Sequence, residues 1–299
     1  MVETHDFLPS VKHFQAIQTI CLTFSYRGNS LSLKRTLALS TVVLLSLTIY
    51  INFLAGTGQI NGVATGEMSN RYPTLFTPAG FTFAIWSIIY LLNITFAAII
   101  AYQAFKRPER IDIRLLVAFI LVCIFNIGWI FAWHYNELFL SVILMISLLY
   151  SLIYSFRVAR DTEPSDWQDQ LVRVNFSVYL GWISVATIAN VTVLLISKSV
   201  FISDTASWLL TIAVMIVAVF LAAWMLIRFN NMAYALVVAW AFWGIYSANV
   251  VRTDESSQII TLAASVGIVL VLVTSGYAFS RKFVRLKSPN LEKVQPNDA

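Results

Sequence analysis

Eight long apolar segments, separated by short polar stretches, limit the fold of this chain more than any other sequence feature. Each holds about 19 to 24 residues, and the Asp, Glu, Lys and Arg residues lie outside them, although charged residues are only 12% of the chain. About 20 residues of helix cross a bilayer core, whereas barrel strands are half as long and alternate in polarity. We therefore predict an all-α, polytopic membrane helix bundle with eight transmembrane helices, near Thr36–Ala55, Phe81–Ala104, Leu115–Trp133, Leu138–Phe156, Phe176–Ile196, Ser207–Ile227, Met232–Val250 and Ile259–Phe279.

The basic residues predict the orientation of these spans. With eight helices, 17 of the 20 Lys and Arg residues fall on one side, and only Arg71, Lys198 and Arg252 fall on the other. Lys and Arg near membrane helices stay in the cytoplasm, so both termini are predicted to be cytoplasmic. This basic excess favours contact with the lipid bilayer and its anionic headgroups over nucleic acid binding.

Chemistry-bearing residues are scarce in the spans. None has an Asp, Glu, Lys, Arg or His near its middle, which argues against a proton- or ion-coupled pump. The sequence offers no metal-ligand spacing, phosphate-binding glycine loop or nucleophile with a base, so we predict no catalytic and no metal-binding residues. His134 and Glu137 are expected in a solvated turn at the outer surface.

Aromatic and amide side chains follow one face of three spans. They are Trp86, Tyr90 and Asn93 in the second span, Asn126, Trp129 and Trp133 in the third, and Tyr179, Trp182, Ala186 and Asn190 in the fifth. Such polar groups must find partners within hydrocarbon. Two interpretations follow: the faces pack against each other, or they line a cavity for a flat, mostly apolar ligand.

The longest outer loop is a candidate cover for the same cavity, and the seventh span is expected to contribute little to it. The loop runs from Gly56 to about Gly80, and its glycines and prolines predict turns rather than a helix. Its Tyr72, Phe76 and Pro78 are candidates for a lid over the bundle. The aromatic residues of the seventh span drift around the helix, so the last three helices are expected to contribute little to the cavity wall.

Three stretches resemble the translocator protein family, whose bacterial members are called TspO or tryptophan-rich sensory proteins. They are Phe81–Phe96 (FTFAIWSIIYLLNITF), the Asn126 and Trp129 pair, and Tyr179–Asn190 (YLGWISVATIAN). The resemblance covers about residues 36 to 196 and implies a five-helix bundle. This chain departs from the family in having the isolated Pro78 before the second span, Val178 before Tyr179, and three further helices.

The resemblance implies that the cavity binds a tetrapyrrole such as a porphyrin or haem. By position, Trp86, Tyr90, Asn126, Trp129, Trp182, Ala186 and Asn190 would line it, and the stripes add Asn93 and Tyr179. No obligate cofactor is implied beyond such a bound porphyrin or haem. A homodimer and a location in the bacterial plasma membrane are also implied.

The chain is accordingly divided into four parts. Residues 1–35 form an N-terminal cytoplasmic tail, 36–196 a TspO-like bundle, 197–280 three additional transmembrane helices, and 281–299 a basic C-terminal tail. The leading hypothesis is a ligand-binding membrane sensor that is not an enzyme. A small-molecule permease is the alternative, and a porphyrin-degrading activity is the third hypothesis.

Overall fold

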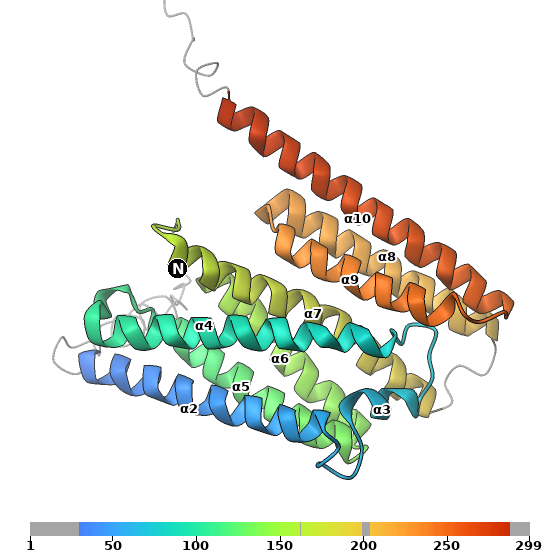
Figure 1. The fold of residues 1–299 in the computed structure, drawn as a ribbon, viewed down its shortest axis with the longest axis horizontal. Coiled ribbons are helices and arrows are strands. Elements are labelled where there is room, and N and C mark those ends of the chain that lie inside the picture. The colour runs from blue at the N-terminus through green and yellow to red at the C-terminus, as the bar shows by residue number, and fades with distance from the viewer. Residues whose placement is uncertain (1–29, 162, 199–203, 288–299) are drawn as a thin grey trace, which may run out of the picture.

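The structure, a computed structural model, describes residues 30–161, 163–198 and 204–287, and this part of the chain forms helices and no strands (Figure 1). Most of the predicted N-terminal tail and the last residues of the C-terminal tail lie outside the described residues. The helices are α2 (Ser30–Gly56), α3 (Thr65–Asn70), η1 (Gly80–Ala84), α4 (Ile85–Lys106), η2 (Pro108–Arg110), α5 (Ile113–His134), α6 (Leu138–Val158), α7 (Trp167–Ser197), α8 (Asp204–Phe229), α9 (Met232–Asn249) and α10 (Glu255–Lys287).

Each predicted span coincides largely with a long helix, and α4 is preceded by η1. Seven of the described helices are long and apolar enough to cross a membrane: α2, α4 with η1, α5, α6, α7, α8 and α10. Among the long described helices, α9 is outside this group, because its tryptophans, tyrosines and Asn249 lower its mean hydropathy. The chain is an integral, multi-pass membrane protein.

The helices pack as a ring of five beside a group of three (Figure 1). In the ring, neighbouring helices contact one another in the order α2, α4, α7, α6 and α5, and α5 returns to α2. The helices α8, α9 and α10 all contact one another, and α9 faces α7 and η1. The last three helices are therefore joined to the ring mainly through α9.

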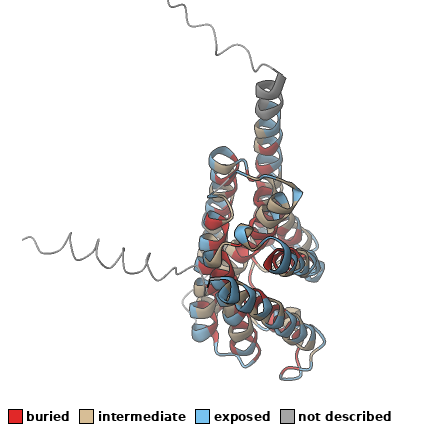
Figure 2. Ribbon diagram, turned by 90° about the vertical axis from the view of Figure 1, so that its left-hand side faces the viewer, coloured by how far each residue is buried: buried red, intermediate tan, exposed pale blue. Residues whose placement is uncertain are grey.

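Burial follows the membrane environment. Exposed residues lie along the outer faces of the helices (Figure 2), and many are large and apolar, such as Val43, Leu91, Phe139, Ile227 and Leu262. Apolar surface of this extent is typical of contact with lipid, so the outer faces lie against the bilayer. The interior holds fully buried rings, including those of Phe96, Phe119 and Phe176, whose centroids are 4.8 to 6.0 Å apart.

Polar residues fix the ends of the helices on the basic side. The Asp166 carboxylate caps α7 by accepting from the backbone N–H groups of Gln168 and Asp169. Arg110 of η2 donates to Asp166 (2.6 Å) and to Asp169 (2.8 Å), which joins the α4–α5 connection to α7. The hydrogen bond from Arg110 holds the pKa of the Asp166 carboxyl at about 2, so it remains ionised at physiological pH.

One prediction about the long outer loop is wrong, because the loop contains the short helix α3. The Glu67 carboxylate accepts from the backbone N–H of Ala64 at 3.0 Å, and its negative charge is favourable in the first turn of a helix. Met68 and Ser69 of α3 are buried against the bundle. The predicted turns do occur before α3, where Gly58 and Gly62 have positive φ angles of 75° and 67°.

Candidate ligand-binding site

Trp86 of α4 lies at the centre of an aromatic cluster formed by α4, α5 and α7. Its ring stacks on Tyr90 (centroids 5.6 Å apart) and on Trp129 (6.4 Å). The rings of Tyr179 and Trp182 meet it edge-on at 5.9 and 6.3 Å. The three predicted aromatic faces therefore point toward one another.

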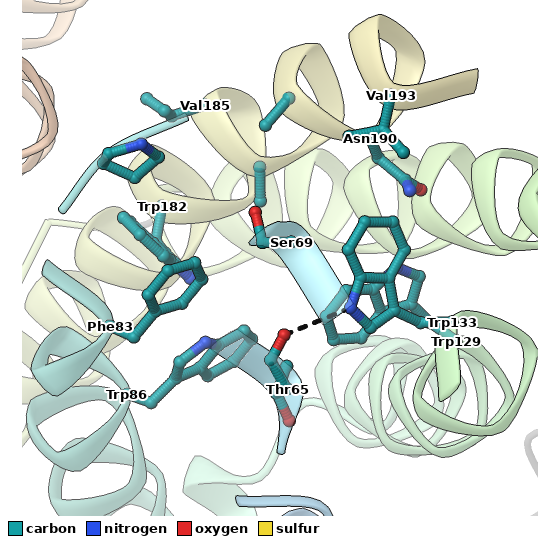
Figure 3. Close-up of a pocket in the computed structure, with 13 residues that line it drawn as sticks. Thr65, Ser69, Phe83, Trp86, Trp129, Trp133, Trp182, Val185, Asn190 and Val193 are labelled. Atoms are coloured by element: carbon teal, nitrogen blue, oxygen red, sulfur yellow. Dashed lines mark hydrogen bonds between the residues drawn. The ribbon is translucent and has the colours of Figure 1, made fainter. Parts of the chain in front are cut away.

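A cavity of about 50 Å3 lies beside this cluster (Figure 3). Its wall comes from α3, the segment before α4, and the facing sides of α4, α5 and α7: Thr65, Ser69, Pro78, Phe83, Trp86, Trp129, Trp133, Trp182, Val185, Ala186, Ala189, Asn190 and Val193. No charged residue of the described chain is among them. Five predicted ligand residues and the lid residue Pro78 line this cavity.

A second cavity, of about 280 Å3, lies next to the first. The two share Thr65, Phe83, Trp86 and Trp129, so these side chains form the partition between them. Tyr90 lines the second cavity together with residues of α2 and the loop. Of the other predicted residues, Asn93, Asn126, Tyr179, Tyr72 and Phe76 line neither cavity.

Two indole N–H groups at the first cavity lack a partner. The side chains of Trp129 and Trp182 are only 6% and 3% exposed, and their Nε1 atoms have no hydrogen-bond partner among the described residues. A buried donor without an acceptor typically costs about 1–3 kcal/mol. Two residues of the cavity wall therefore carry buried donors that have no acceptor in the closed structure.

Two of the predicted amides instead join helices. Asn126 accepts from the Asn52 side-chain amide of α2 at 2.7 Å and donates to the Tyr179 hydroxyl of α7 at 3.1 Å. Asn190 of α7 and Ser141 of α6 donate to each other, at 3.0 and 3.2 Å. Asn126 is thus engaged in interhelical bonding, whereas Asn190 both bonds to α6 and lines the cavity.

The outer loop is fastened to the end of α5. Trp133 Nε1 donates to the Thr65 carbonyl (3.4 Å), and the Thr65 hydroxyl lies 3.3 Å from His134 Nε2. Asn61 donates to the His134 carbonyl at 2.7 Å. The expectation of a solvated His134 is wrong: the side chain is fully buried because α3 and its preceding turn cover it. Its Nδ1–H donates to the Ile130 carbonyl, and Tyr72 donates to Asn136 at 2.9 Å.

Several lining residues were not predicted from the sequence. Val185, Ala189 and Val193 extend the face of α7 that carries Trp182 and Ala186, so the helical period alone would have found them. Thr65 and Ser69 depend on α3, which was not predicted. Trp240 and Trp243 of α9 are absent from the lining of both cavities.

Comparison with known proteins gives one match. A family model described as TSPO-like protein matches residues 38–277, which include all of the long helices except the ends of α2 and α10. No curated protein and no solved structure matches the chain. The matched region extends well beyond the ring of five helices, so α8, α9 and most of α10 belong to what this family shares.

Proposed function

Because the chain belongs to the TSPO-like protein family, we propose that it is a membrane sensor for a flat, mostly apolar ligand such as a porphyrin or haem. The ligand would bind among α4, α5 and α7, beneath the outer loop. The observation that carries this proposal is the pair of buried indole N–H groups of Trp129 and Trp182 at the wall of an aromatic cavity. In ordinary helix packing most buried donors find an acceptor.

The chemistry of the wall matches this ligand class. Trp86, Trp129 and Trp182 offer ring faces, and stacking adds about 0.5–1.5 kcal/mol beyond the burial of apolar area. A tetrapyrrole carries polar atoms and carboxylates at its edge that can accept from indole N–H groups. A ligand acceptor would remove the cost of the unpartnered donors and thus stabilise the complex.

The size of the cavity supports a sensor rather than a rigid carrier. Pockets for drug-sized ligands are about 300–1,000 Å3, whereas the two cavities measure about 50 and 280 Å3 and are divided by Phe83 and Trp86. A tetrapyrrole would fit only after the partition and the loop move. Binding is therefore coupled to a change of shape, which a sensor needs in order to report its ligand.

We further propose that α9 is an eighth transmembrane span. Its 18 residues give a helix of about 27 Å, close to the thickness of the hydrocarbon core. Only Asn230 and Asn231 separate α8 from α9, and a φ of 49° at Asn230 turns the chain back along α8. If α8 crosses the membrane, α9 returns across it, and both termini lie in the cytoplasm.

The three functional hypotheses are separated by one set of measurements on purified, reconstituted protein. A sensor binds protoporphyrin saturably without net flux into proteoliposomes. Saturable uptake of the porphyrin into proteoliposomes would favour the permease, and loss of porphyrin absorbance with new products in the light or the dark would favour degradation. The mass of the reconstituted complex tests the homodimer implied by the family.

A further inference from the structure

The segment between α3 and α4 forms part of the cavity wall. We call residues 75–83 the connector; it includes most of η1 and leads into α4, and its Pro78 and Phe83 line the first cavity. Phe83 also lines the second cavity and meets Trp182 edge-on at 6.0 Å. An opening on this side of the cavity would therefore displace the connector.

The connector is held from outside by α9, which lines neither cavity. Three hydrogen bonds join them: Asn249 Nδ2 to the Leu75 carbonyl (3.0 Å), the Ala79 N–H to the Gly244 carbonyl (2.9 Å), and Trp240 Nε1 to the Thr82 carbonyl (2.9 Å). Each uses a backbone group of the connector, and such groups cannot be left without a partner inside a membrane protein. These bonds make α9 the partner of the connector backbone.

Side-chain packing brings the two elements close together. A Cβ at Gly244 would overlap the side chain of Thr82 and come within 2.9 Å of Pro78 Cβ, so only glycine allows this approach. Phe81 of the connector packs on Trp240 (5.7 Å) and Trp243 (5.2 Å). The contact with α9 therefore involves Pro78, Phe81 and Thr82 of the connector.

We propose that α9 clamps the connector, and that Trp240, Gly244 and Asn249 are positioning residues which set the rates of ligand uptake and release. Opening the cavity breaks bonds to α9, so a weaker clamp lowers the cost of opening in both directions. The bonds to α9 form again once the ligand is bound, and only the partition side chains stay displaced, so uptake and release accelerate together while the equilibrium affinity changes less. The ligand in this proposal rests on the proposed function, but the clamp itself does not.

The kinetic test uses stopped-flow binding of protoporphyrin to the full-length protein. Trp240→Phe keeps an aromatic ring beside Phe81 but removes the donor to Thr82; Gly244→Ala pushes the connector away. We expect association and dissociation rates about fivefold faster, the ratio that corresponds to one neutral hydrogen bond. The controls are Trp224→Phe on α8, whose ring packs on Phe229, and Gly276→Ala on α10, where a Cβ has open space.

A second measurement needs no ligand. Amide hydrogen exchange of peptides covering residues 75–83 should rise in Trp240→Phe and Gly244→Ala and stay at the parent value in both controls. If exchange is faster in these two variants but the parent does not bind porphyrin, the clamp stands and the proposed ligand is rejected. The clamp is overturned if exchange in Trp240→Phe stays unchanged or rises equally in the controls. It is also overturned if the parent binds porphyrin but the binding and release rates of Trp240→Phe and Gly244→Ala stay at the parent values.

Discussion

Trp182 lines the cavity and carries a buried indole N–H without a partner, so its replacement separates the ring from the donor. Trp182→Phe keeps an apolar ring but removes the donor and some contact area. We expect about tenfold weaker protoporphyrin binding, or about 1.4 kcal/mol. The affinity is measured by quenching of tryptophan fluorescence. Trp224→Phe, the same exchange far from the cavity, should leave the affinity within twofold of the parent; equal losses in both variants would exclude a specific role for Trp182.

Ala186 tests whether the space beside Trp182 belongs to a ligand or to helix packing. A leucine at this position would project into the cavity, where the ligand would otherwise lie. We expect Ala186→Leu to weaken protoporphyrin binding at least tenfold while the melting temperature stays near that of the parent. If the faces simply pack together, overpacking would instead cost about 1–3 kcal/mol of stability and lower the melting temperature.

Asn126 is predicted to act on stability and not directly on the ligand. Asn126→Ala leaves the Asn52 amide and the Tyr179 hydroxyl without their partner, which should cost about 1–3 kcal/mol of unfolding free energy. Asn93→Ala removes the same atoms from a buried side chain whose Oδ1 has no partner, and should cost less. Thermal unfolding in one detergent compares the two. A large loss of porphyrin affinity in Asn126→Ala, with unchanged stability, would contradict this assignment.

Among the elements, α9 carries the topology prediction. If α9 crosses the membrane, a reporter fused after residue 229 should be cytoplasmic, one after residue 253 should lie outside, and one after residue 295 should again be cytoplasmic. The physical reason is the tight reversal at Asn230 and the basic residues from Arg281 onward, at the end of α10 and after it. Reporters after residues 229 and 253 on the same side would refute the eighth span.

Sequence reasoning identified the long helices well because hydrocarbon imposes both their length and their internal hydrogen bonding. It missed the first turns of α7, from Trp167, because they are polar and lie outside the apolar run, although Asp166 is a recognisable N-cap. It also missed α3, whose few residues are stabilised by tertiary contacts such as that of Trp133 with Thr65. Short elements of this kind depend on packing more than on local pattern.

The candidate site was predictable to a similar degree. Helical periodicity placed the aromatic faces of α4, α5 and α7 together, as the geometry of Trp86 demonstrates. It could not separate indoles without partners from amides that join helices. That distinction depends on the partners Asn52 and Ser141, which come from other helices and follow no period that the sequence displays. The contact of α9 with the connector was equally hidden, because it joins residues more than 150 positions apart.

At the scale of the whole molecule, the five-helix ring and the outer loop supply the cavity wall, and α9 of the last three helices contacts the connector at its edge. The family match spans both parts, so the arrangement belongs to a shared architecture and not to a separate appended domain. We propose that this architecture encloses a binding site which opens for a flat ligand.

Binding at this site is tested most directly by titrating the purified parent protein with protoporphyrin and following tryptophan fluorescence and melting temperature. We expect saturable quenching at one porphyrin per chain. The melting temperature should rise with porphyrin concentration, because a ligand that binds only the folded state stabilises it. Quenching that never saturates, together with a melting temperature that does not change, would contradict it.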